Sequence, residues 1–124
     1  MENKGTFRDL VVWQKAIDLS TVVCQATRSM PTSERFGLIA QMHRATVSIP
    51  SNIAEGNARY QLGDYLHFLG IARGSLAELE TQLIIASNLQ MLPQTPGLFD
   101  QIQEVRRMLQ GLIDSLRRKR DGAE

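Results

Sequence analysis

Three side chains in the middle of the chain carry functional groups for metal binding or acid–base catalysis: His43, Glu55 and Glu80. Imidazole nitrogens and carboxylate oxygens both ligate metals and both transfer protons. Di-metal helical bundles use a Glu from each of two helices and a Glu-x-x-His motif from each of the other two. The sequence contains no Glu-x-x-His, and His67 is its only other histidine. We therefore expect no catalytic residue, metal, other cofactor or small-molecule substrate, and keep an enzyme or metal protein built on these three residues as an alternative.

Basic side chains offer a second kind of chemistry, the neutralisation of nucleic-acid phosphates. With 14 basic and 13 acidic residues the net charge is only +1, so such binding would need local clusters of charge. A charge run at a chain end is usually a solvated tail. The candidates for phosphate contacts are Arg35, Arg44, Arg59, Arg117, Arg118, Lys119 and Arg120.

A third group of polar residues lies within strongly apolar helical segments, where buried polar groups need hydrogen-bond partners. Guanidinium groups suit bidentate contacts with carboxylates, so Arg73 is expected to pair with Glu55 or Glu80. Asn52 and Gln82 are expected to link neighbouring helices. We interpret the group as a structural network within the protomer or at a subunit interface, formed by Gln41, Asn52, Glu55, Arg73, Glu80 and Gln82.

Four helices are expected to position these residues, over about 9–30, 34–55, 64–89 and 96–120, because apolar residues recur there at three- and four-residue steps. No segment has the alternation of a strand. Gly56 is the predicted stop of the second helix, since glycine adopts the left-handed conformation easily. Asp64 and Thr95 are the predicted caps of the third and fourth helices.

Pro50 and a pair of glycines predict local irregularities. Pro50 removes a backbone donor and crowds the carbonyl of Thr46, which predicts a kink, and Ser48 is expected to satisfy a freed carbonyl nearby. Gly70 and Gly74 lie four residues apart on one helical face. They predict the close approach of another helix, because each interior glycine costs about 1 kcal/mol relative to alanine.

Short connections make consecutive helices antiparallel neighbours, which predicts an all-α, antiparallel up-down-up-down four-helix bundle. We expect one domain over residues 1–124, with disordered ends at about 1–6 and 120–124. The second helix carries two apolar stripes, of which one is expected to face the core and the other a neighbouring subunit. The alternative is that this helix is simply the most buried one of a monomer. The stripes are Leu38, Met42, Ala45 and Ile49, and Ile39, Thr46, Pro50 and Ile53.

The cellular setting is expected to be the cytoplasm. Cys24 is the only cysteine, so an intrachain disulfide cannot form. The N-terminal residues are polar and lack the apolar core of a signal peptide. No apolar run reaches the length of a membrane span.

Three segments resemble a small bacterial family, the four helix bundle proteins, also described as encoded by intervening sequences within 23S ribosomal RNA genes. The segments are DLVVWQKA at 9–16, FGLIAQMHRATVSIPSNIAEG at 36–56 and FLGIARGSLAELETQL at 68–83. The resemblance implies a four-helix bundle that assembles into a homopentamer. The accessory variability proteins of diversity-generating retroelements are similar, and form pentamers whose basic surfaces engage a reverse transcriptase and nucleic acid. Where the family often has two basic residues before the alanine at position 45, this sequence has His43 and Arg44.

These observations together predict a non-enzymatic homo-oligomer, by resemblance a pentamer, that acts as a binding or scaffolding protein. RNA or a nucleic-acid enzyme is the leading partner class, and no membrane is expected to be involved. The first alternative is a module devoted only to protein–protein assembly.

Overall fold

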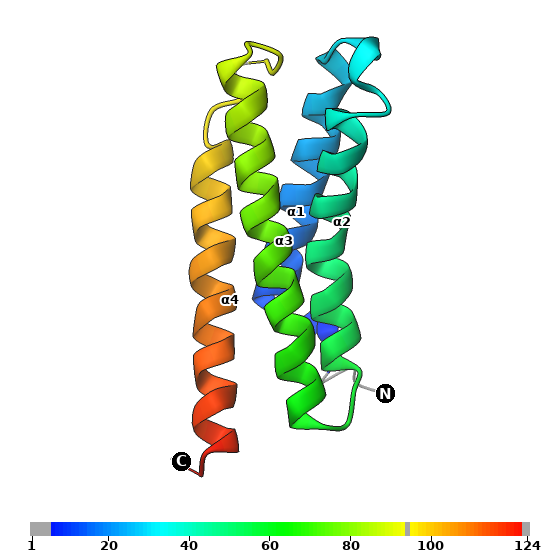
Figure 1. Cartoon of the computed structure of the whole chain (residues 1–124). Helices are drawn as coiled ribbons and strands as arrows, with labels where there is room; N and C mark the ends of the chain where they lie inside the picture. Colours follow the sequence, from blue (N-terminus) through cyan, green and yellow to red (C-terminus); the bar gives the residue numbers. More distant parts are fainter. Residues whose placement is uncertain (1–5, 94, 123–124) are drawn as a thin grey trace.

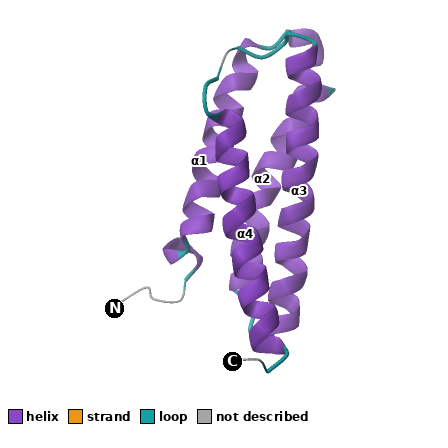
Figure 2. Ribbon diagram, turned by 90° about the vertical axis from the view of Figure 1, so that its left-hand side faces the viewer, coloured by secondary structure: helices purple, strands orange, loops and turns teal. Residues whose placement is uncertain are grey.

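The computed structural model describes residues 6–93 and 95–122, and all regular structure within them is helical (Figure 2). The four long helices are α1 (Val11–Ala26), α2 (Leu38–Asn57), α3 (Leu62–Asn88) and α4 (Leu98–Arg120). Short 3-10 turns occur at η1 (Phe7–Asp9), η2 (Thr27–Ser29) and η3 (Thr32–Glu34). The predicted all-α class is confirmed.

Successive helices run in opposite directions along one bundle axis (Figure 1). Each helix contacts its neighbour in sequence, α1 also contacts α4, and the contact between α2 and α3 is the most extensive. The antiparallel up-down-up-down four-helix bundle predicted from the sequence is therefore confirmed. The disorder expected at the chain ends falls largely on residues 1–5 and 123–124, which lie outside the described residues, whereas α4 continues to Arg120.

The core is a column of aliphatic side chains, with one stripe from each helix. Each fully buried Leu or Ile contributes about 1.5–3 kcal/mol to stability, so these stripes hold the helices together. Fully or almost fully buried members are Ala16, Leu19, Val23, Met42, Ile49, Ile53, Leu69, Ala72, Leu76, Leu79, Leu83, Ile102, Val105 and Leu109.

Both apolar stripes of α2 lie inside the single chain. Met42, Ile49, Thr46, Pro50 and Ile53 are all buried, because α2 lies between α1 and α3 and contacts both. The prediction that the second stripe faces a neighbouring subunit is wrong, and α2 is instead a deeply buried helix of the protomer.

The chain continues as a helix through Pro50, and the carbonyl of Thr46 finds a partner on another helix. The hydroxyl of Ser20 in α1 donates to this carbonyl at 2.8 Å. The expected compensation by Ser48 is wrong, because the Ser48 hydroxyl bonds to Ser75 on α3 at 2.8 Å.

Gly56 is a buried residue within α2 rather than its left-handed stop, so that prediction is wrong. A Cβ added at Gly56 would lie 3.0 Å from the Cβ of Phe68 and 3.0 Å from Cδ1 of Tyr65. The glycine therefore allows α2 and α3 to approach closely near their connection. Within the described part of the protomer no helix closely approaches Gly70 or Gly74, since a Cβ added at either would meet nothing within 4 Å.

The cap predictions for the last two helices are also wrong. α3 begins at Leu62, which places Asp64 in its first turn. The Thr95 hydroxyl donates to the carbonyl of Pro93 at 3.2 Å, and α4 begins after Gly97, whose φ is 83°. Gly97 adopts the left-handed conformation that glycine tolerates best, and so turns the chain into α4.

Candidate nucleic-acid interface

The end of α1 and the start of α2 form a groove lined by three basic side chains, Arg28, Arg35 and His43. The η2 turn tightens the end of α1, and the extended backbone at Met30 leads the chain through Pro31 into η3. This path brings Arg28 and Arg35 to the same groove, although they lie on separate elements. The groove has a volume of about 410 Å³, and its other lining residues are Cys24, Thr27, Met30, Thr32 and Ile39.

Among the described residues, the arginines of this groove have no acidic partner. Its lining contains no Asp or Glu. Among residues 6–93 and 95–122, no carboxylate lies within ion-pair distance of Arg28 or Arg35. Unpaired guanidinium groups near a surface attract phosphate over roughly a Debye length, about 8–10 Å in physiological salt. The groove is therefore suited to an anionic ligand.

His43 is held in the wall of this groove by Thr27. Thr27 is buried, and its hydroxyl donates to the carbonyl of Cys24 at 2.9 Å. The Thr27 oxygen also forms a hydrogen bond of 2.7 Å with Nε2 of His43. These two bonds hold the imidazole ring in the wall of the groove.

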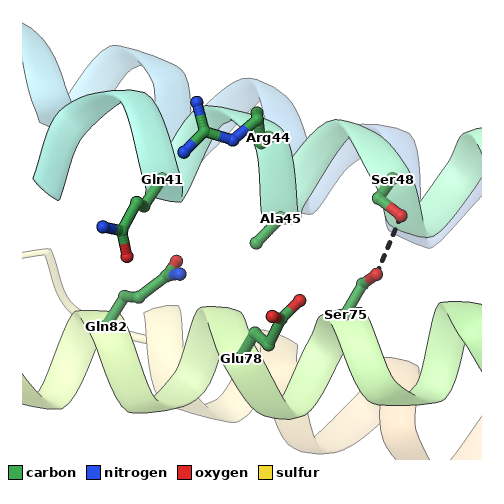
Figure 3. Close-up of a pocket in the computed structure, with 7 residues that line it drawn as sticks. All are labelled: Gln41, Arg44, Ala45, Ser48, Ser75, Glu78 and Gln82. Atoms are coloured by element: carbon green, nitrogen blue, oxygen red, sulfur yellow. Dashed lines mark hydrogen bonds between the residues drawn. The ribbon is translucent and has the colours of Figure 1, made fainter. Parts of the chain in front are cut away.

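Arg44 belongs to a different groove, between α2 and α3, with a volume of about 330 Å³. Figure 3 shows its residues, with the side chains of Gln41 and Gln82 pointing toward one another from facing helices. Glu78 lines the same groove and offsets the charge of Arg44. Arg44 and Arg35 were both predicted as phosphate contacts, but they do not share one site.

The polar floor of this second groove joins α2 to α3. The hydroxyls of Ser48 and Ser75 lie 2.8 Å apart, and Nδ2 of Asn52 donates to the Ser48 hydroxyl at 2.8 Å. Asn52 therefore contributes to a cross-helix link through Ser48. Oε1 of Gln82 is buried and has no hydrogen-bond partner among the described residues, so the direct link expected from Gln82 is absent there.

The remaining basic candidates lie at the opposite end of the bundle, where α2 and α4 end (Figure 1). Arg59 forms an ion pair with Glu55 at 2.7 Å, and its guanidinium carbon lies 4.8 Å from the centre of the Phe68 ring. Its charge is thus already engaged. Arg120 pairs with Asp121 at 3.0 Å, while Arg117, Arg118 and Lys119 are exposed in the last turn of α4. These residues form a second basic area, separate from the groove at Arg35.

The two acidic residues of the predicted network have partners other than Arg73. Nη1 of Arg73 donates to Oε1 of Gln110 on α4 at 3.0 Å. Glu80 forms an ion pair with Arg106, and Glu55 forms one with Arg59. The predicted Arg73 ion pair is wrong, because antiparallel packing of α3 on α4 sets Arg73 opposite Gln110 and Glu80 opposite Arg106.

The residues proposed for metal binding are likewise dispersed. His43 bonds to Thr27, Glu55 to Arg59 and Glu80 to Arg106. Within the described ranges no three His, Cys, Asp or Glu side chains are grouped closely enough to hold a metal ion. The alternative based on these three residues has no assembled site in this part of the chain.

Sequence reasoning missed Thr27, Arg28 and Arg106. Arg28 falls in the last turn of the first predicted helix, where a basic residue has a ready explanation in the helix dipole. Nothing local distinguishes it from a solvated charge. Its place in the groove depends on the path of the chain through Met30 and Pro31, which brings it near Arg35.

No helix among the described residues is both long enough and apolar enough to cross a membrane.

Comparison with known proteins identifies one family. Curated proteins yield no match to the sequence. The family model described as 23S rRNA-intervening sequence protein matches residues 8–111, which is most of the chain and includes all of the groove. The chain therefore belongs to the 23S rRNA-intervening sequence protein family.

Proposed function

We propose that the protein is a non-enzymatic RNA-binding protein that works as a homo-oligomer. The observation that carries the RNA assignment is the groove between α1 and α2, where Arg28 and Arg35 have no acidic neighbour in the lining. Phosphate groups are the polyanionic partner that such unpaired arginines suit best. The family description refers to an intervening sequence of 23S rRNA, which makes that RNA the first one to test.

Self-association is supported by the outer face of α3. Ile71, Ile84 and Ile85 are 39–45% exposed, and Gly70 and Gly74 on the same side leave space for a neighbour. The outward positions of α4 are mostly polar by contrast, among them Asp100, Gln103, Arg107 and Ser115. Exposed apolar residues grouped on one helix face are typical of a surface that contacts another protein chain. The resemblance described above makes a pentamer the expected assembly, in which repeated grooves would bind one RNA with increased avidity.

RNA binding is tested by measuring the affinity for fragments of 23S rRNA over a range of salt concentrations. A variant with Arg28→Gln and Arg35→Gln should bind at least tenfold more weakly, and the slope of log K against log salt should fall by about 2, or about 1 per lost phosphate contact. The matched control is Arg117→Gln with Arg118→Gln, which removes the same charge from the opposite end. Equal loss in both variants, or no binding at low salt, would contradict the proposed interface.

Self-association is tested by light scattering, with the 13.9 kDa protomer as the unit of mass. The wild-type protein should have the mass of a pentamer, and Gly74→Arg on α3 should reduce it. Gly111→Arg is the control, because Gly111 is also an exposed helical glycine with nothing within 4 Å of an added Cβ, but on α4. A wild-type monomer at micromolar concentration would rule out the oligomer. An oligomer without RNA affinity would favour the alternative of a module for protein assembly alone.

A further inference from the structure

An exposed aromatic residue, Phe36, is the next residue in sequence after Arg35 of the basic groove. Phe36 is 89% exposed, although phenylalanine is normally among the most buried residue types. It directly follows Arg35 in the short segment between η3 and α2, so the two Cα atoms are about 3.8 Å apart. At this exposure, packing against the described residues does not hold the Phe36 ring in place.

The groove floor adds an apolar surface next to the charges. Met30 is buried, Ile39 and Cys24 are half-buried, and all three line the groove together with Arg28 and Arg35. A simple anion would use the arginines and leave this floor unused. A ligand that uses both must carry an apolar group next to a negative charge, as a nucleotide does.

We infer that this end of the bundle binds single-stranded RNA, with Arg28 and Arg35 holding a phosphate and Phe36 stacking on an adjacent base. Base stacking on an exposed aromatic side chain is a general means of binding single strands, since every base has a π-face. Bases within a duplex are already stacked and paired, so they cannot reach Phe36 or the floor at Met30. A groove of about 410 Å³ accommodates about one nucleotide, not a double helix. The inference rests on the RNA binding proposed above and names the class of RNA.

The chain supplies a matched control at its other end. Tyr60 is fully exposed and directly follows Arg59, just as Phe36 follows Arg35. Arg59, however, is paired with Glu55 and lies against the Phe68 ring. The two aromatic residues therefore have similar exposure and similar sequence context but different access to an unpaired cation.

The test measures fluorescence anisotropy of a short labelled RNA, either single-stranded or annealed to its complement, with the full-length protein. Phe36→Ala should weaken single-strand binding by about tenfold or more, while Phe36→Trp should retain it. Tyr60→Ala should have no effect. Duplex RNA should bind more weakly than the single strand and should be insensitive to Phe36→Ala. The salt slope should be the same for wild type and Phe36→Ala, because no charge is removed.

Several results would overturn the inference while leaving the proposed function intact. One is RNA binding that depends on Arg28 and Arg35 but not on Phe36 or on strandedness. Another is a change in oligomer mass on Phe36→Ala with unchanged RNA affinity, which would make Phe36 a contact between protein chains. A polyglutamate peptide that binds as tightly as RNA, with the same sensitivity to Phe36→Ala, would reassign the site to acidic proteins. Absence of any RNA binding at low salt would instead refute the proposed function itself.

Discussion

The hydroxyl of Ser20 donates a hydrogen bond of 2.8 Å to the backbone carbonyl of Thr46, the helical acceptor that loses its usual partner at Pro50. The Thr46 hydroxyl in turn donates to the Ser20 oxygen at 3.2 Å. Residues 26 apart in sequence thereby repair the break in the hydrogen-bond ladder of α2. The repair explains how α2 continues through a buried proline, and it ties α2 to α1.

Ser20→Ala should destabilise the protein by about 1–3 kcal/mol, because it leaves the buried Thr46 carbonyl without a donor. Thr21→Ala is the control, since the Thr21 hydroxyl bonds to the Ile17 carbonyl of its own helix and is exposed. Chemical denaturation should show little change for Thr21→Ala. In a Pro50→Ala background, which restores the backbone donor, Ser20→Ala should cost clearly less. Equal cost in both backgrounds would show that the two residues are not coupled.

Gly56→Ala and Gly111→Ala should change stability in opposite directions. Alanine favours a helix over glycine by about 1 kcal/mol, so Gly111→Ala on the exposed side of α4 should stabilise by up to that amount. At Gly56 the new methyl group would lie 3.0 Å from the Phe68 Cβ and 3.1 Å from the Tyr65 carbonyl oxygen. Because backbone atoms cannot easily move away, Gly56→Ala should destabilise by about 1–3 kcal/mol. Thermal unfolding measures both, and a stabilised Gly56→Ala would contradict the close packing.

Arg106→Ala should cost more stability than Arg73→Ala. Arg106 forms the ion pair with Glu80, in which the two side chains are only 34% and 25% exposed, and it also donates to Gln103 at 2.6 Å. Arg73 is exposed and has only the hydrogen bond to Gln110. The expected losses are about 1 kcal/mol for Arg106→Ala and below about 0.5 kcal/mol for Arg73→Ala. The midpoints of urea unfolding compare the two variants. A larger loss of stability in Arg73→Ala than in Arg106→Ala would count against the assigned ion pair between Arg106 and Glu80.

Alkaline pH should destabilise the protein in part through Tyr65. Burial raises the pKa of the Tyr65 hydroxyl above its usual value near 10, with a smaller opposing effect from the Asn57 hydrogen bond. The neutral phenol is thus favoured in the folded state, while the unfolded chain loses this proton first. The stabilisation is complete below about pH 10 and is lost as pH rises through the folded pKa.

Unfolding free energies at about pH 8 and about pH 11 test this linkage, because the two values bracket the usual tyrosine pKa. Tyr65→Phe should lose less stability between them than the wild type does. Tyr60→Phe should behave as the wild type, since Tyr60 is fully exposed. If all three proteins lose the same stability, Tyr65 does not contribute to the alkaline transition.

The four helices and their antiparallel order could be predicted from the sequence, because helical periodicity and short connections are local properties. Pro50 could be located in the same way as an interruption within α2. The residues expected to begin or end a helix were less informative. Gly56, for example, allows close packing of α2 on α3 and does not form a left-handed turn. One residue type has several structural uses, and only its neighbours in space distinguish them.

The candidate site was predicted only in part. Arg35 could be identified as a basic residue, but its grouping with Arg28 and His43 depends on the path of the chain through Met30 and Pro31. The same is true of the pairs Ser20–Thr46 and Glu80–Arg106, whose members lie on different helices. The sequence by itself determined which residues are helical and which faces are apolar. Only the tertiary structure decided which polar groups meet, because the rotation and register of each helix depend on packing against all of its neighbours together.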